Sequence, residues 1–144
     1  MLHNYSILKR LCFSDEVVFH CNGKVNPHNS VIWGYENPHE YEEIPMKSQG
    51  VTVWVALFHD KVIGPFIFDS TVNKENYLQM LQDFFVPHLK RLRRYSTTYF
   101  QQDGAPPHWG LNVRNFLDQS FPERWIGRDG PIHWPSRSPD LTQL

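Results

Sequence analysis

The chain has 144 residues, 40% of them hydrophobic and 20% charged, which is the composition of one ordinary globular domain. With 14 Lys and Arg against 15 Asp and Glu, its formal net charge is −1. A free-standing DNA-binding domain is usually basic, so any binding of nucleic acid by this chain depends on a local basic patch or on another domain. The two cysteines lack CxxC spacing, which excludes a disulfide framework and argues against a zinc site.

The first half of the chain predicts an antiparallel meander of strands. Residues 10–21 are expected to form the first strand, and residues 31–33 a short strand after a turn. The nearly continuous apolar run at 51–58 predicts a strand that is buried on both faces. Residues 62–68 are expected to form its partner, and Pro65 within them indicates the edge of the sheet.

The second half predicts alternating helices and strands. A long helix is expected to begin at Asn73 as its N-cap, and Pro87 should kink or split it. A strand at 97–100, a helix at 110–119 and a last strand at 132–134 follow. This order predicts an α/β sheet covered by helices on both faces, and it is the order of the ribonuclease H-like fold.

Two aspartates are candidates for chemistry because of their positions. Asp15 lies inside the first strand between apolar residues, and Asp103 follows a later strand at a Gly-Pro break. If the two strands are neighbours, their carboxylates can meet. Carboxylates a few ångströms apart repel each other and are stable together mainly around a cation. Hard oxygen ligands suit Mg²⁺ or Mn²⁺, which can support phosphodiester cleavage.

The spacing alone leaves a plainer interpretation open. An aspartate beside a strand is commonly a turn former or a member of an ion pair. Strand neighbours point to opposite faces, so Asp15 and Glu16 are not expected to face the same cleft. Glu16 is therefore interpreted as a structural or solvent-facing acid.

Several short segments resemble, in order, the motifs of the catalytic domain of mariner-superfamily transposases. The segments are Leu11-Cys12-Phe13-Ser14-Asp15-Glu16, Gly23-Lys24-Val25-Asn26, Val31-Ile32-Trp33-Gly34, Val51-Thr52-Val53-Trp54, Ile63-Gly64-Pro65, Gln101-Gln102-Asp103-Gly104-Ala105-Pro106-Pro107-His108 and Trp134-Pro135-Ser136-Arg137-Ser138-Pro139-Asp140-Leu141. Each segment is short, but the ordered set is specific and runs over nearly the whole chain.

This resemblance implies a ribonuclease H-like mixed sheet with flanking helices, with Asp15 and Asp103 as catalytic and metal-binding residues. It implies two Mg²⁺ or Mn²⁺ ions in the intact family site. The implied activity is DNA cleavage at the transposon end, followed by attack of the released 3′-hydroxyl on target DNA, preferably at TA. The implied partners are the transposon ends and the target DNA.

The expected location is the nucleus, with the cytoplasm as the alternative for a fragment. No apolar run reaches the length of a membrane span, and the first residues show no signal-peptide pattern. We therefore expect no membrane contact.

The chain departs from the family pattern at both ends. In the family the third acid lies five positions after the aspartate of Ser-Pro-Asp-Leu, which from Asp140 falls one residue beyond Leu144. Asp140 itself is interpreted as a loop residue. The 14 residues before Asp15 are too few for the family's helix-turn-helix modules. Residues 1–144 are therefore expected to be a truncated catalytic domain, weak or inactive, with an apolar patch where the C-terminal helix is missing.

Three alternatives stay open. One is a non-catalytic relict or co-opted module that binds nucleic acid or protein, and that dimerises with itself or with a full-length transposase. Another is an intact enzyme of which this sequence is a part. The last is a ribonuclease H-type nuclease acting on RNA–DNA hybrids, against which the ordered motifs argue.

Several basic residues are candidates for DNA contact. They are His108, Lys90, Arg91, Arg124, Arg128 and Arg137. The histidine either lines the cleft near metal or DNA or makes a local hydrogen bond at a helix start. The pair at 90–91 belongs to a basic cluster that either holds a phosphate backbone or complements a helix C-terminus. The three arginines surround the approach to the third acid, where they meet DNA or are solvated loop charges.

Overall fold

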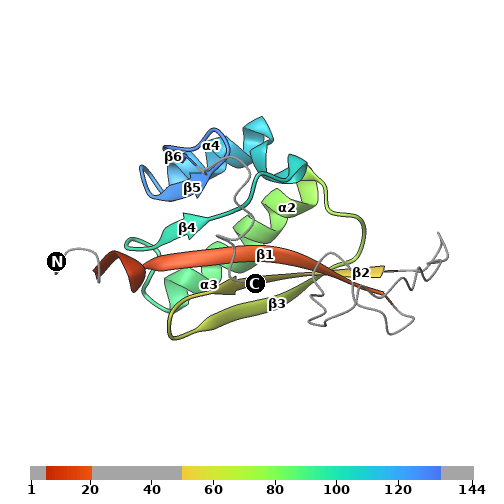
Figure 1. Ribbon diagram of the computed structural model, residues 1–144, viewed down its shortest axis with the longest axis horizontal. Coiled ribbons are helices and arrows are strands. Elements are labelled where there is room, and N and C mark those ends of the chain that lie inside the picture. Colours follow the sequence, from red (N-terminus) through yellow and green to blue (C-terminus); the bar gives the residue numbers. More distant parts are fainter. Residues whose placement is uncertain (1–5, 21–49, 134–144) are drawn as a thin grey trace, which may run out of the picture.

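The structure is a computed structural model that describes residues 6–20 and 50–133 (Figure 1). The strands are β1 (Leu11–His20), β2 (Gly50–Leu57), β3 (Val62–Phe68), β4 (Tyr99–Gln101), β5 (Trp125–Gly127) and β6 (Ile132–His133). The helical elements are α2 (Lys74–Met80), the π-helix η2 (Leu81–Phe85), α3 (Val86–Arg91), the 3₁₀-helix η3 (Pro106–Trp109) and α4 (Leu111–Ser120).

These six strands form one mixed sheet in the order β3-β2-β1-β4-β5-β6. The β1–β2 and β2–β3 pairs are antiparallel, whereas the β1–β4, β4–β5 and β5–β6 pairs are parallel. This arrangement confirms the ribonuclease H-like order predicted from the sequence. Strand β3 lies at the edge of the sheet, as Pro65 predicts, because proline has no N–H to donate to a further strand.

The long helical segment begins at a cap and is interrupted once. The Asn73 side chain accepts a hydrogen bond from the Asn76 N–H at 2.8 Å, and the Asn76 side chain accepts one from the Asn73 N–H at 2.8 Å. This capping box confirms Asn73 as the N-cap. The helix widens into a π-helix over Leu81–Phe85 before it becomes α-helical again. Pro87 accounts for this change, because it lacks an N–H and its ring displaces the carbonyl four residues earlier.

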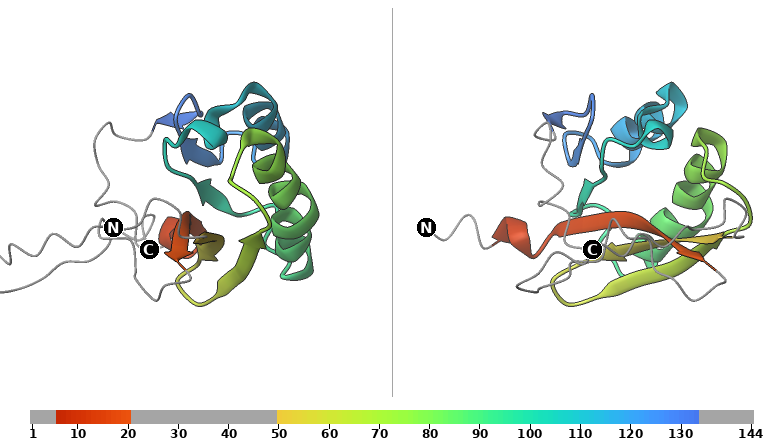
Figure 2. Two further views of the ribbon diagram at one scale, coloured as in Figure 1. Left: turned by 90° about the vertical axis from the view of Figure 1, so that its right-hand side faces the viewer. Right: turned by 45° about the vertical axis from the view of Figure 1, so that its right-hand side comes forward.

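The helices and the sheet bury one core between them (Figure 2). Trp54 and Phe100 from the sheet and Tyr77, Phe85 and Leu117 from the helices are all 0% exposed. The ring of Phe85 lies 5.2 Å from that of Trp54 and 4.8 Å from that of Phe100. Phe85 therefore joins the helical layer to both the antiparallel and the parallel half of the sheet.

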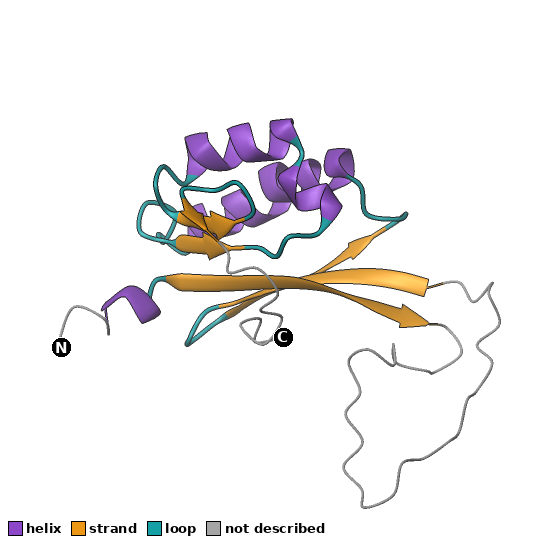
Figure 3. Cartoon of the chain, turned by 45° about the horizontal axis from the view of Figure 1, so that its top comes forward, coloured by secondary structure: helices purple, strands orange, loops and turns teal. Residues whose placement is uncertain are grey.

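Helices α2, α3 and α4 lie on one face of the sheet (Figure 3), although the sequence predicts helices on both. The β3–β4 and β4–β5 crossovers advance across the sheet in the same direction, and right-handed connections then place their helices on the same side. The opposite face carries apolar side chains such as Ile67, which is 57% exposed. The prediction that 51–58 is buried on both faces is therefore wrong, since Trp54 and Ala56 are buried and Val53 is only half-buried.

The sequence does not predict β5, because three residues ending in glycine carry no periodic signal. This strand exists through its parallel pairing with β4, in which Trp125 lies opposite Phe100. The last predicted strand is present as β6, although residue 134 lies outside the described part, as do residues 31–33. No helix among the described residues is long and apolar enough to cross a membrane.

Candidate functional site

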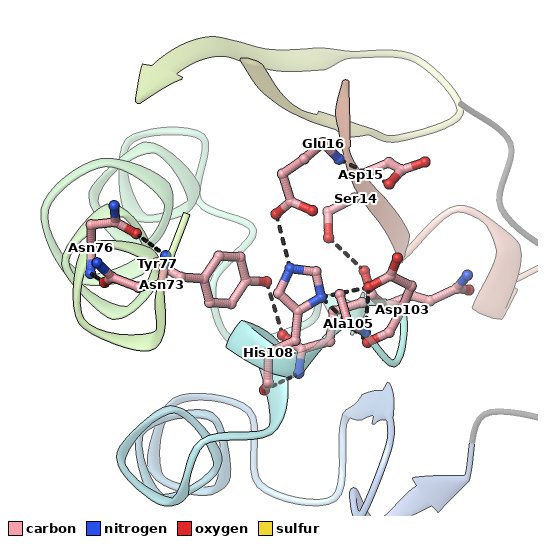
Figure 4. Close-up of polar contacts among 11 residues, drawn as sticks. Ser14, Asp15, Glu16, Asn73, Asn76, Tyr77, Asp103, Ala105 and His108 are labelled. Carbon is pink, nitrogen blue, oxygen red and sulfur yellow. Dashed lines mark hydrogen bonds and ion pairs between the residues drawn. The ribbon is translucent and has the colours of Figure 1, made fainter. Parts of the chain in front are cut away.

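Asp15 lies within β1, and Asp103 lies two residues past the end of β4, its parallel neighbour in the sheet. Strands β1 and β4 pair with Phe13 opposite Gln101, and each aspartate follows its member of that pair by two positions. Both side chains lie near the end of β4 (Figure 4), close enough that the negative charge of Asp103 helps to raise the pKa of Asp15. The sequence predicts that the two acids can meet if their strands are neighbours, and β1 and β4 are neighbours in the sheet.

Asp15 is half-buried and has little to compensate its charge. Its Oδ1 accepts a hydrogen bond from the Glu16 backbone N–H at 2.8 Å, the one hydrogen bond that its carboxylate accepts from the described residues. Burial, helped by the negative charges of Asp103 and Glu16, raises the pKa of Asp15 to about 6 despite that hydrogen bond. A carboxylate in these surroundings is stabilised by a bound cation.

Asp103 has the opposite environment. Its Oδ1 lies 2.6 Å from Nδ1 of His108 and accepts a hydrogen bond from the Ala105 N–H at 3.0 Å. Burial alone would raise the pKa of Asp103, but the hydrogen bond and charge of His108, together with the Ala105 N–H, outweigh it and hold the pKa below its ordinary value. Asp103 is therefore ionised throughout the neutral pH range.

His108 is buried beside Asp103, with 2% exposure, and its role as a DNA contact stays a prediction. Its Nε2 lies 3.0 Å from Oε1 of Glu16, and its ring lies 4.3 Å from that of Tyr77. Burial alone would lower the pKa of His108, yet the carboxylates of Asp103 and Glu16 raise it to about 10. His108 is thus a cation enclosed between two acids.

A buried polar network supports this histidine. The Tyr77 hydroxyl donates to Oε1 of Gln102 at 2.8 Å, and Nε2 of Gln102 donates to the His108 carbonyl at 2.8 Å. The Ser14 hydroxyl donates to the Gln101 carbonyl at 2.8 Å, which ties β1 to the end of β4. Because each of these groups finds a partner, the network holds the two strand ends in a fixed relation.

The two aspartates supply the oxygen ligands that Mg²⁺ and Mn²⁺ prefer. Each carboxylate uses Oδ1 for a bond within the protein, and its Oδ2 accepts no hydrogen bond from the described residues. Within residues 6–20 and 50–133 there is no group of three or more His, Cys, Asp or Glu side chains that could hold a metal. The carboxylates of Asp15 and Asp103 therefore fit part of a divalent-metal site.

An apolar groove of about 500 Å³ runs from Asp15 along the open face of the sheet. It is lined by Asp15, Val17, Phe19, Val53, Val55, Pro65 and Ile67. The apolar walls contribute to the desolvation of the carboxylate.

Lys90 and Arg91 are exposed at the end of α3. The Lys90 ammonium lies 4.9 Å from the centre of the Tyr95 ring, and the Arg91 guanidinium lies 3.0 Å from Nδ1 of His88. Cations at a helix C-terminus are stabilised by the helix dipole without any ligand. Their role as DNA contacts stays a prediction.

The three candidate arginines have different settings. Arg124 donates to the Thr98 carbonyl at 2.6 Å, so its guanidinium joins β5 to the segment before β4. Arg128 is exposed and lies over the Trp109 ring at 4.4 Å, beside the segment that carries the site histidine. Arg137 lies outside the described residues.

Of the two interpretations of Glu16, structural or solvent-facing, the structure favours the structural one, because its side chain is 13% exposed and contacts His108; the sequence does not identify that partner. The available signal is the alternation along β1, where Cys12 and Ser14 are buried and Glu16 points to the same side. A carboxylate on a buried face needs a compensating cation. His108, five residues after Asp103, provides that cation.

Solved structures show which folds this chain resembles. The Mos1 transposase paired-end complex with left transposon end matches with a TM-score of 0.65 and 24% identity, over 96% of this chain and 39% of that one. A pre-cleavage Mos1 transpososome matches with a TM-score of 0.66 and 21% identity, over 96% and 40%. The catalytic domain of Mos1 mariner transposase matches with a TM-score of 0.60 and 22% identity, over 96% and 56%. The chain has the fold of that catalytic domain.

The chain spans about two fifths of the Mos1 chains in the DNA complexes, at 39% and 40% of their length. Mos1 has been solved with transposon-end DNA and with Mn or Mg. These ligands were bound to Mos1, and the similarity of this chain to Mos1, at 21–24% identity, is a similarity of fold alone. No protein-family model and no curated protein matches the chain.

Proposed function

We propose that the chain belongs to the mariner superfamily and forms the metal-binding part of a transposase catalytic domain, which cleaves DNA at transposon ends and joins it to target DNA. The observation that carries this proposal is that Asp15 in β1 and Asp103, just past the end of the adjacent parallel strand β4, lie close enough for their charges to interact. The Mos1 fold and the ordered motifs support it. The proposed cofactor is Mg²⁺ or Mn²⁺, the proposed partner is DNA, and the proposed location is the nucleus.

In this function the carboxylates of Asp15 and Asp103 would hold the metal. When bound, the metal supplies activation of an attacking hydroxyl and stabilisation of the leaving oxygen in phosphodiester cleavage. The chain's own residues prepare the site in two ways. His108 keeps Asp103 ionised, and the desolvated setting of Asp15 favours a cation beside it.

Nicking of supercoiled plasmid by the 144-residue chain tests this proposal. The assay compares wild type, Asp15→Asn and Asp103→Asn in Mn²⁺ or Mg²⁺, with Asp69→Asn as the matched control because that aspartate is exposed and follows β3. We expect slow, metal-dependent nicking by wild type and by the control, and none by the two site variants.

Mn²⁺ binding by the same proteins separates the candidate functions. A folded chain that binds Mn²⁺ through both aspartates but never nicks DNA would favour the non-catalytic module, and a pull-down with an intact relative would then test dimerisation. A folded chain that neither binds Mn²⁺ nor nicks DNA would refute the proposed catalytic role.

A further inference from the structure

His108 connects carboxylates from two distant segments of the chain (Figure 4). Its Nδ1 lies 2.6 Å from Oδ1 of Asp103, and its Nε2 lies 3.0 Å from Oε1 of Glu16. Ionised carboxylates accept hydrogen bonds and cannot donate them, so both ring nitrogens donate. A ring with both nitrogens protonated has no lone pair for a metal. His108 therefore stands beside a candidate metal ligand without being one.

The surroundings hold this ring in one orientation. His108 is 2% exposed, the Tyr77 ring lies against it at 4.3 Å, and its backbone carbonyl accepts a hydrogen bond from Gln102. Rotating the ring away from either carboxylate would leave buried polar groups without partners, which is unfavourable. The contacts with Asp103 and Glu16 are therefore fixed together.

The histidine makes the two oxygens of Asp103 unequal. Oδ1 is occupied by His108 and by the Ala105 N–H at 3.0 Å, whereas Oδ2 accepts no hydrogen bond from the described residues. Glu16 follows Asp15 directly on β1. The His108 ring, which contacts both Glu16 and Asp103, therefore links the strand that carries Asp15 to the segment that carries Asp103. One ring thus fixes the orientation of Asp103 and its position relative to β1.

We propose that His108, anchored by Glu16, is a positioning residue that presents Oδ2 of Asp103 to the divalent metal; this role rests on the proposed function. Neither His108 nor Glu16 is a ligand in this arrangement. Groups that orient a metal ligand through a hydrogen bond change metal affinity by about 10–100-fold when they are removed.

Two substitutions of His108 separate the two sides of the ring. His108→Asn keeps an amide donor near the place of Nδ1 and so keeps the bond to Asp103. His108→Gln extends its amide toward the place of Nε2 and loses that bond. We expect His108→Gln to weaken Mn²⁺ binding by about 10–100-fold, and His108→Asn to restore most of the affinity. The readout is the Mn²⁺ dissociation constant of the 144-residue chain, measured by electron paramagnetic resonance.

Glu16 provides a matched pair of variants. Glu16→Gln keeps an amide oxygen that accepts from Nε2, so its Mn²⁺ affinity should stay within a few-fold of wild type. Glu16→Ala removes the anchor and should weaken binding by about tenfold or more. Circular dichroism and urea unfolding establish that each variant is folded before its affinity is compared.

The failure of this inference is distinguishable from the failure of the proposed function. If Asp103→Asn abolishes Mn²⁺ binding while folded His108→Gln and Glu16→Ala bind like wild type, the positioning role is overturned and the metal site stands. If Asp103→Asn leaves Mn²⁺ binding unchanged, the proposed function itself fails. Should His108→Gln not fold, the comparison of Glu16→Ala with Glu16→Gln decides the matter, and equal affinities overturn the inference.

Discussion

The two site aspartates should change the stability of the metal-free chain in opposite directions when each is replaced by asparagine. Burial raises the pKa of Asp15, which means that its charge destabilises the fold, whereas His108 holds the pKa of Asp103 low, which means that its charge stabilises the fold. Asparagine keeps the shape of the side chain and removes the charge. Asp15→Asn should therefore stabilise the chain at neutral pH, and Asp103→Asn should destabilise it.

The magnitude for Asp15 follows from its pKa, which rises from 3.8 to about 6. At 1.36 kcal/mol for each pKa unit, that rise corresponds to about 3 kcal/mol, and partial exposure of the carboxylate reduces it to about 1–2 kcal/mol. Because the folded pKa lies above the unfolded one, the cost is absent below pH 3.8, grows as the pH rises, and is complete above about 6. The gain from Asp15→Asn should be full at about pH 7.5 and fade toward about pH 4.

Urea unfolding followed by tryptophan fluorescence in excess EDTA measures these changes. The control Asp69→Asn should stay within about 0.5 kcal/mol of wild type. Adding Mn²⁺ should then stabilise wild type and the control but neither site variant, because a ligand stabilises only the state that binds it. The electrostatic reasoning is refuted if Asp15→Asn destabilises the metal-free chain at about pH 7.5 while the control is neutral.

Three further predictions test the core and the surface. Burial raises the pKa of the Cys12 thiol, so iodoacetamide should label Cys12 only after unfolding. Rapid labelling of Cys12 itself in the native chain, located by mass spectrometry, would contradict this. Phe85→Ala should cost about 3–5 kcal/mol in urea unfolding, and a loss under about 1 kcal/mol would show that this ring does not join the two halves of the core. Arg94 donates two hydrogen bonds to the Asp60 carboxylate, at 2.7 and 2.6 Å, and they lower the pKa of Asp60 to about 2. The pair therefore stabilises the fold above about pH 4, and this stabilisation is lost as the pH falls through about 2. NMR titration should show that pKa, and an Arg94→Gln variant with the same Asp60 pKa would contradict the assignment.

Much of the fold could be predicted because local signals and chain order agree. The cap at Asn73, the interruption before Pro87 and the edge strand around Pro65 each follow from the chemistry of one residue. The meander followed by crossovers predicts the ribonuclease H-like fold, but it leaves open whether the strands of the two aspartates are neighbours, and the sheet order shows that β1 and β4 are. A site built at strand ends is therefore accessible to sequence reasoning.

The contacts beneath the site could not be predicted in the same way. The contact between Glu16 and His108 joins residues 92 positions apart, and its geometry depends on where the segment after β4 turns. Tyr77 belongs to a helix whose periodicity predicts only that it faces the core, without identifying Gln102 as its partner. Strand β5 is too short to carry a pattern and is defined by its pairing with β4 and β6. In each case a tertiary contact decides what the local sequence leaves open.

The charge balance of the site predicts how many divalent ions the 144-residue chain binds tightly. Ionised Asp15, Asp103 and Glu16 carry three negative charges and the imidazolium of His108 carries one positive charge, so the set has a net charge of −2. One divalent cation neutralises this set, whereas a second would meet no remaining charge among the described groups. Mn²⁺ titration should therefore saturate at about one tight ion per chain, although the family resemblance implies two ions in an intact site. Two tight ions per chain would contradict this charge balance.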